Sequence, residues 1–243
     1  MARDDTAMRK SAAIGALMIG LLIAPSAKAE WRISVYGGGS HTFDSDVKLR
    51  QPGGTDLTLK DVPWRDESFE SPIYYGARLT YWFEDSPWGL ALDFTHAKMI
   101  ANTGDVVEVS GTRAGMPVSG QEPLGGTFSN LQISHGLNLL TLNGLYRLRL
   151  PVAIEPYAGI GVGVAIPHVE TEIAGVATQD YQLAGPAAQA LVGINAPVHG
   201  RFSAFLEYKL SYANIDGDLS GGGTLEVEPW TNHFVLGLSF QLY

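Results

Sequence analysis

Apolar residues recur at every second position in eight stretches of the chain. In "YYGARLTYWF" (74–83), the residues Tyr75, Ala77, Leu79, Tyr81 and Phe83 alternate with Tyr74, Gly76, Arg78, Thr80 and Trp82. The other stretches are 31–38, 89–99, 135–149, 153–168, 184–196, 201–213 and 231–243. Successive side chains of a strand point to opposite faces, so each stretch predicts a strand with one apolar face. Most approach the length of about 9–11 residues that crosses a bilayer when tilted.

The connections between these stretches alternate between short and long. The segments 84–89, 148–153 and 195–201 are tight, whereas 42–72, 100–134, 169–183 and 214–230 are long and rich in Gly, Asp, Ser and Thr. Outer-membrane barrels have an even strand count, short periplasmic turns and long extracellular loops. The sequence therefore predicts an all-β fold, an eight-stranded antiparallel transmembrane β-barrel in the outer membrane, with the long loops facing the cell exterior.

The first 29 residues have the pattern of a secretory signal peptide. Arg9 and Lys10 precede the apolar run "AAIGALMIGLLIA", and Ala27-Lys28-Ala29 suits cleavage before Glu30. The run is shorter than the roughly 20 residues of a spanning helix. Residues 1–29 are thus expected to be removed, leaving 30–243 as one barrel domain.

Charge and cysteine content narrow the function further. The formal net charge is -9, and loss of residues 1–29 removes four cations and two acids, giving -11. A nucleic-acid partner is not expected on such a chain, and no protein partner is implied. The chain has no cysteine, which excludes disulfides, a thiolate nucleophile and cysteine metal ligands.

Several charged residues fall on the inward face of the predicted strands. A barrel of eight strands has an interior that side chains fill. The residues expected inside are Arg78, Asp93, Arg147, Glu155, Glu207 and Lys209. They predict a structural network of ion pairs that closes the lumen, because buried charges need partners.

Histidines gather at one end of the predicted barrel. The residues expected at the outer rim are His41, His96, His135, His168 and His233, and His199 falls in a periplasmic turn. His96 and Lys98 follow the apolar row of "LDFTHAKM" and are expected at the level of the lipid head groups. Glu170 shares a face with His168, and imidazole with carboxylate suits a divalent transition metal or acid–base chemistry. The alternative is that polar rim residues simply meet water and head groups.

Ser134 beside His135 raises the further alternative of a serine nucleophile with a histidine base. Adjacent strand residues point to opposite faces, however, so such a serine would have to come from another strand.

Five segments together resemble a known family. They are "ISVYGGGSHT" (33–42), "SPIYYGARLTYWF" (71–83), "LDFTHAKM" (92–99), "HGLNLLTLNGLYR" (135–147) and "EPYAGIGVGVAIPHVE" (155–170). These segments are similar to the outer-membrane lipid A oxidases of Gram-negative bacteria. The resemblance implies a small barrel that oxidises the proximal glucosamine of lipid A to 2-aminogluconate with molecular oxygen. It implies lipopolysaccharide as the partner and an oxygen-dependent oxidoreductase as the activity.

Protein side chains alone do not reduce molecular oxygen, so the reaction needs a metal or cofactor. A metal held by histidine and carboxylate is the cofactor that this composition allows. The catalytic candidates are His96, His135 and His168; the metal candidates are His41, His96, His135, His168 and Glu170. Lys98, Arg113 and Lys48 are candidates for binding the phosphates of lipid A. Two alternatives stay open, a non-enzymatic barrel of the OmpA or OmpW type and a lipid A acyl hydrolase or acyltransferase.

Overall fold

The computed structural model describes residues 30–242, so the predicted signal peptide lies outside the described residues. Eight strands form the barrel: β1 (Glu30–Thr42), β5 (Tyr75–Trp82), β6 (Trp88–Ala101), β9 (Asn130–Arg147), β10 (Glu155–Ile173), β12 (Gly185–His199), β13 (Phe202–Ala213) and β16 (Trp230–Gln241). Each pairs antiparallel with the next in this order, and β16 pairs with β1 to close the ring. The predicted eight-stranded barrel is confirmed.

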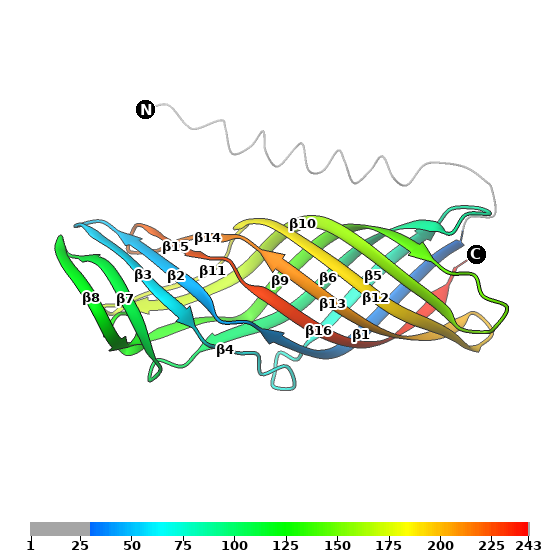
Figure 1. Cartoon of the computed structure of the whole chain (residues 1–243), viewed down its shortest axis with the longest axis horizontal. Helices are drawn as coiled ribbons and strands as arrows, with labels where there is room; N and C mark the ends of the chain where they lie inside the picture. Colours follow the sequence, from blue (N-terminus) through cyan, green and yellow to red (C-terminus); the bar gives the residue numbers. More distant parts are fainter. Residues whose placement is uncertain (1–29, 243) are drawn as a thin grey trace, which may run out of the picture.

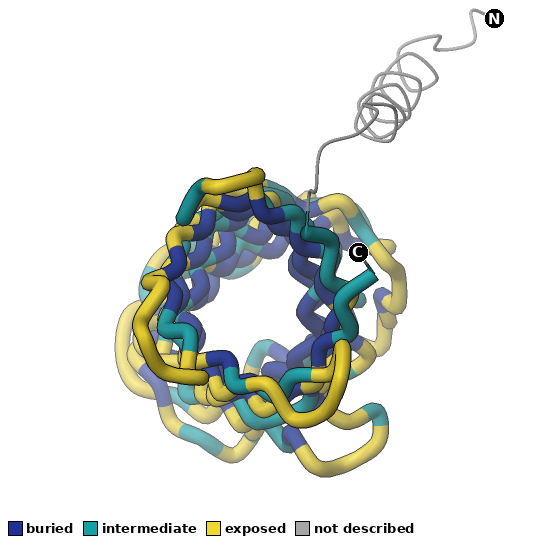
Figure 2. Tube along the Cα trace, turned by 90° about the vertical axis from the view of Figure 1, so that its right-hand side faces the viewer, coloured by how far each residue is buried: buried dark blue, intermediate teal, exposed yellow. Residues whose placement is uncertain are grey.

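Side chains alternate between the inside and the outside of the wall, as the period of two predicts. Along β13, Phe205, Glu207 and Lys209 are buried, while Phe202 and Leu206 are exposed on the outside. Figure 2 looks along the barrel and shows the buried and exposed positions distributed around the closed wall. The inner face of each strand therefore packs against side chains in the barrel interior, and the outer face contacts lipid.

Aromatic rings on the outer surface form two belts. Near the short turns they pair as Trp31–Tyr81, Trp88–Tyr146 and Phe202–Phe240, and toward the other end as Tyr75–Phe94, Tyr208–Phe234 and Tyr212–Trp230. Exposed aliphatic side chains fill the band between them, among them Val35, Leu142, Ile160, Val162, Leu236 and Leu238. An apolar band flanked by aromatic girdles is the surface of a transmembrane barrel. The protein is an outer-membrane β-barrel.

The barrel interior is closed by two groups of ion pairs. In the middle, Arg78 lies 2.7 Å from Glu207 and 3.1 Å from Asp93, and Lys209 lies 2.7 Å from Asp93. Nearer the periplasmic end, Arg147 pairs with both Glu30 and Glu155, at 2.6 and 3.3 Å.

The six predicted inward charges therefore divide into two groups. The cavity between these groups, which Arg78 and Tyr157 help to line, measures about 30 Å³. A volume of that size holds about one water molecule, so the lumen is a filled core at this level.

The four long connections were expected to be loops, and this prediction was incomplete. Three of them, 42–72, 100–134 and 214–230, contain a six-stranded sheet in the order β14-β15-β2-β3-β7-β8, the extracellular sheet, which extends from one end of the barrel (Figure 1). Its strands are β2 (Ser45–Gln51), β3 (Thr55–Val62), β7 (Val106–Arg113), β8 (Met116–Pro123), β14 (Ile215–Asp218) and β15 (Thr224–Val227). Two short strands, β4 (Trp64–Arg65) and β11 (Val176–Tyr181), pair with β6 and β10. The sheet has its own buried residues, including Val47, Leu49, Leu57, Leu59 and Val109.

The turns at the opposite end are short and lie beside the start of β1 and the end of β16 (Figure 1). No helix in the described part of the chain is long and apolar enough to span a membrane.

Candidate functional site

A bulge in β9 creates the polar site at the outer rim. One residue, Lys98, lies between Ala97 and Met99 of β6, whereas three residues lie between their β9 partners Leu137 and Ile133. These three are Ser134, His135 and Gly136, so β9 has two residues more than β6 at this point. Gly136 has φ +131°, a conformation that residues other than glycine rarely adopt. Bulges re-aim side chains out of the regular ladder. This one brings Ser134 and His135 to the same neighbour on β10.

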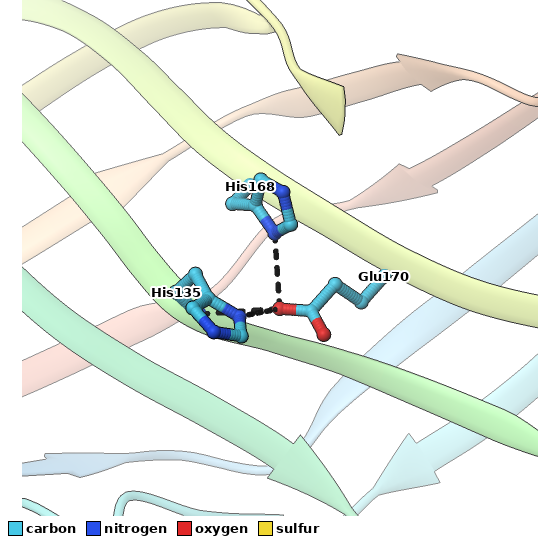
Figure 3. A group of neighbouring side chains, drawn as sticks. All are labelled: His135, His168 and Glu170. Carbon is cyan, nitrogen blue, oxygen red and sulfur yellow. Dashed lines mark hydrogen bonds and ion pairs between the residues drawn. The ribbon is translucent and has the colours of Figure 1, made fainter. Parts of the chain in front are cut away.

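That neighbour is the carboxylate of Glu170. Its Oε1 atom accepts hydrogen bonds from Ser134 Oγ at 2.7 Å and the backbone N–H of His135 at 3.2 Å. The Nδ1 atoms of His135 and His168 face the same oxygen at 2.6 and 3.0 Å (Figure 3). Gln132 Nε2 donates to the other oxygen at 3.3 Å. Both imidazoles therefore turn the same ring nitrogen toward one anion.

Glu170 is the buried centre of this group, which we call the rim cluster: His135, His168 and Glu170. Burial raises the pKa of Glu170, but hydrogen bonds from His135, Ser134 and His168 outweigh it and lower the pKa to about 2. The side chain of Glu170 is 6% exposed, that of His168 15% and that of His135 59%. Glu170 thus stays ionised at the centre of the cluster, and one imidazole is open to the outside.

The rim cluster has the donor set of a transition-metal site. One ligand atom from each of its three residues lies within 4.8 Å of the others. Two imidazoles and a carboxylate suit Zn, Cu, Fe or Ni. Gln132 and Ser134 donate hydrogen bonds to the Glu170 carboxylate and orient it, as hydrogen-bonded neighbours of metal ligands commonly do. A divalent ion bound here would replace the Nδ1 protons that now face Glu170.

Tyr181 from β11 covers the cluster, and no pattern in the sequence predicts this contact. Its hydroxyl donates to the carbonyl oxygen of His135 at 3.0 Å, and its ring centroid lies 4.5 Å from that of His168. The β10–β11 hairpin places it there, because His168 and Tyr181 are directly paired across the two strands. The long connection at 169–183, expected to be a loop, thus supplies one wall of the site.

His96 lies beside the cluster on β6 but is enclosed. It is 3% exposed, its ring stacks on Tyr75 at 4.7 Å, and its Nδ1 atom lies 2.9 Å from Oδ1 of Asn138. A Cβ atom on Gly136 would lie 2.6 Å from His96 Nδ1, so the bulge packs directly against this ring. Lys98, two residues further along the same face of β6, is enclosed as well and is 4% exposed.

The remaining predicted site residues lie elsewhere. His41 is on β1, 3.7 Å from Asp66, and is not part of the rim cluster. Lys48 pairs with Glu226, and Arg113 with Glu122, both within the extracellular sheet.

His233 lies near the outer end of β16 and points into the barrel, where it is fully buried and 2.8 Å from Ser211 Oγ. Strand alternation predicts this orientation, since its neighbour Phe234 takes the outward position.

Comparison with known proteins assigns this chain to no family. No family model matches it, and no curated protein is similar. Among solved structures, Neisserial surface protein A has 9% identity over 89% of this chain and 99% of its own, with a TM-score of 0.42. The outer membrane protein OprG from Pseudomonas aeruginosa has 18% identity over 87% of this chain and 94% of its own, at 0.42. The outer membrane protein AlkL has 17% identity over 90% of this chain and 95% of its own, at 0.43.

Proposed function

We propose that this outer-membrane barrel oxidises the proximal glucosamine of lipid A to 2-aminogluconate with molecular oxygen, at a divalent metal held by the rim cluster. The observation that carries the proposal is the convergence of His135, His168 and Glu170 within 4.8 Å on the outer side of the wall. Below it on the same surface lies the aromatic pair Tyr75–Phe94. A sugar head group anchored in the outer leaflet occupies this level.

The residues present fit a divalent metal. His135 and His168 would supply nitrogen ligands, and Glu170 would supply oxygen and negative charge. When bound, the metal would supply the exchange of electrons with oxygen that side chains alone lack. The low pKa of Glu170, about 2, keeps its carboxylate ionised throughout the physiological pH range.

The proposed reaction balances with oxygen and water as co-reactants. In lipid A whose C1 carries no phosphate, the C1 hemiacetal of the proximal glucosamine loses two electrons and two protons and becomes a lactone. Molecular oxygen takes up both electrons and both protons and becomes hydrogen peroxide. Water then opens the lactone, so the lipid gains one oxygen atom overall.

An acyl hydrolase built on Ser134 has less support in the geometry. Ser134 Oγ lies 3.3 Å from His135 Nδ1, the same nitrogen that faces Glu170 at 2.6 Å. A nucleophile–histidine–acid relay uses the two ring nitrogens for different partners. Here the serine instead donates straight to the carboxylate at 2.7 Å, which leaves it without a base. A purely structural barrel leaves unexplained why three side chains suited to bind a metal converge at the rim.

Mass spectrometry of lipid A tests the proposal. Membranes with and without the protein, containing lipid A that carries no phosphate at C1, are incubated in air and under nitrogen, and the expected result is a gain of one oxygen atom only with protein and air. His135→Ala and His168→Ala should each abolish that gain, while His41→Ala, a histidine outside the cluster, should retain it. Unchanged lipid A in both gases would refute the oxidase, and loss of an acyl chain would identify a hydrolase instead.

A further inference from the structure

Two polar side chains on the outward face of β6 have no partner within the chain. Lys98 is 4% exposed, and among residues 30–242 no acceptor lies within hydrogen-bond or ion-pair distance of its ammonium group. His96 is 3% exposed, and its Nε2 atom is buried without a hydrogen bond. Buried polar atoms are normally satisfied, so His96 Nε2 needs a partner from outside the chain. The stem of Lys98 is enclosed, but its Nζ atom is not fully buried, so an anion from outside the chain can reach the ammonium group.

The hydrogen bonds around His96 fix which of its nitrogens carries the proton. Asn138 Nδ2 donates to the carbonyl oxygen of Ile166 at 3.1 Å, which turns Asn138 Oδ1 toward the imidazole. That oxygen only accepts, so His96 Nδ1, 2.9 Å away, is the N–H donor. In the neutral ring Nε2 then presents a lone pair, which needs a hydrogen-bond donor from a ligand.

The two requirements together define the chemistry of the ligand. Lys98 needs an anion, His96 Nε2 needs a donor, and two residues along a strand separate the side chains by roughly 7 Å. A phosphate next to a sugar hydroxyl offers this combination over a similar span.

We propose that Lys98 and His96 bind a phosphorylated sugar head group of a glycolipid, with the phosphate on Lys98 and a hydroxyl donating to His96. This subsite rests on the proposed function for the identity of its lipid.

Access to His96 runs past Tyr75. Because Nε2 is buried, binding requires a neighbouring side chain to move, and Tyr75 is stacked on the imidazole and 45% exposed. The bulge residue Gly136 lies against His96, so a head group on this subsite reaches the rim cluster of the neighbouring strands. The phosphate subsite would thus hold the sugar next to the proposed metal.

The other two candidate cations serve as matched controls. Lys48 lies 2.5 Å from Glu226, and Arg113 pairs with Glu122 and donates to Thr127 at 2.8 Å. Both already have anionic partners inside the extracellular sheet. Their substitution changes the net charge as Lys98→Met does, but leaves the subsite intact.

Lipid binding to the mature barrel in nanodiscs, under nitrogen and without metal, tests Lys98. The probes are bisphosphorylated lipid A, its dephosphorylated form, phosphatidylglycerol and inorganic phosphate. Lys98→Met should weaken binding of bisphosphorylated lipid A at least tenfold, and Lys48→Met should not. Dephosphorylated lipid A should bind the wild type as weakly as bisphosphorylated lipid A binds Lys98→Met. Equal affinity of Lys98→Met and wild type would overturn the subsite; equal binding of phosphatidylglycerol or inorganic phosphate would overturn its assignment to a glycolipid.

Nitrogen-15 NMR of labelled histidine tests His96 in the wild-type protein, whatever the folding of the variants. The signal that disappears in His96→Ala should show a proton on Nδ1, and bisphosphorylated lipid A should shift its Nε2 resonance. Asn138→Ala should lose this tautomer, while Asn138→Asp, which keeps the acceptor, should retain it. A proton on Nε2 in the wild type would overturn the role of His96. Because no oxidation occurs in either measurement, failure of the oxidase proposal would leave both results unaffected.

Discussion

The substitution Gly136→Ala puts the β9 bulge to the most direct test. Gly136 has φ +131°, and a Cβ atom there would lie 2.5 Å from Asn138 Oδ1 and 2.6 Å from His96 Nδ1. Neither neighbour yields easily, because Asn138 is held by the Ile166 carbonyl and His96 is stacked on Tyr75. The added methyl group therefore either strains the bulge or breaks the His96–Asn138 hydrogen bond.

The magnitude follows from two costs. A residue other than glycine at positive φ costs about 1–2 kcal/mol. Inserting a methyl group into a filled space costs about 1–3 kcal/mol more. Together they predict a loss of about 3 kcal/mol in the free energy of unfolding, if the bulge keeps its shape. If the bulge relaxes instead, the loss is smaller, but His135 moves away from Glu170 and metal affinity falls.

Urea unfolding in phospholipid vesicles, followed by tryptophan fluorescence, measures the first outcome, and calorimetric titration with a divalent metal measures the second. Gly144→Ala is the matched control, because it lies on the same strand and its added Cβ meets no atom within 4 Å. That control should change the stability by less than about 0.5 kcal/mol. Equal stability and equal metal affinity of the Gly136→Ala and Gly144→Ala proteins would refute the role assigned to the bulge.

Three further predictions follow from the interior and the rim. Asp93→Asn should destabilise the barrel by about 3–5 kcal/mol in the same urea assay, because Lys209 is left buried without its closest anion, and adding Lys209→Met should recover part of the loss. The folded-state pKa of Glu170, about 2, lies below the ordinary 4.5, so the carboxylate stabilises the fold above pH 4.5 and this contribution disappears as the pH falls toward 2. The stability difference between wild type and Glu170→Gln, about 2 kcal/mol at pH 6, should therefore shrink over that window; a constant difference would contradict it. Tyr181→Phe removes the hydroxyl that donates to the His135 carbonyl, so metal affinity measured by calorimetry should fall by up to about tenfold while the barrel stays folded.

The barrel could be predicted from the sequence because lipid imposes one simple rule on every strand. Each spanning strand has a full outward row of apolar residues, as in Phe234, Leu236 and Leu238 of β16, so the period of two extends over many residues. In the strands of the extracellular sheet, the alternation of buried and exposed residues extends over far fewer positions. Val47 and Leu49 of β2 are the only two buried positions of that strand, and polar or charged residues such as Asp46, Lys48 and Arg50 surround them. Two positions do not distinguish a strand from a loop, so the extension of the barrel was missed.

The site was predicted in part, and its central contact was missed for a physical reason. The spacing of His168 and Glu170 placed both on one face, and the structure agrees. Strict alternation also placed Ser134 and His135 on opposite faces, yet both reach Glu170. The bulge breaks the alternation, and its only local signal is Gly136, one of 29 glycines in the chain. In a regular β9, His135 would not reach Glu170. The two extra residues of the bulge bring its imidazole to that carboxylate while β9 stays paired with both neighbouring strands. The bulge in β9 is therefore what places a polar cluster on a barrel surface that is otherwise apolar.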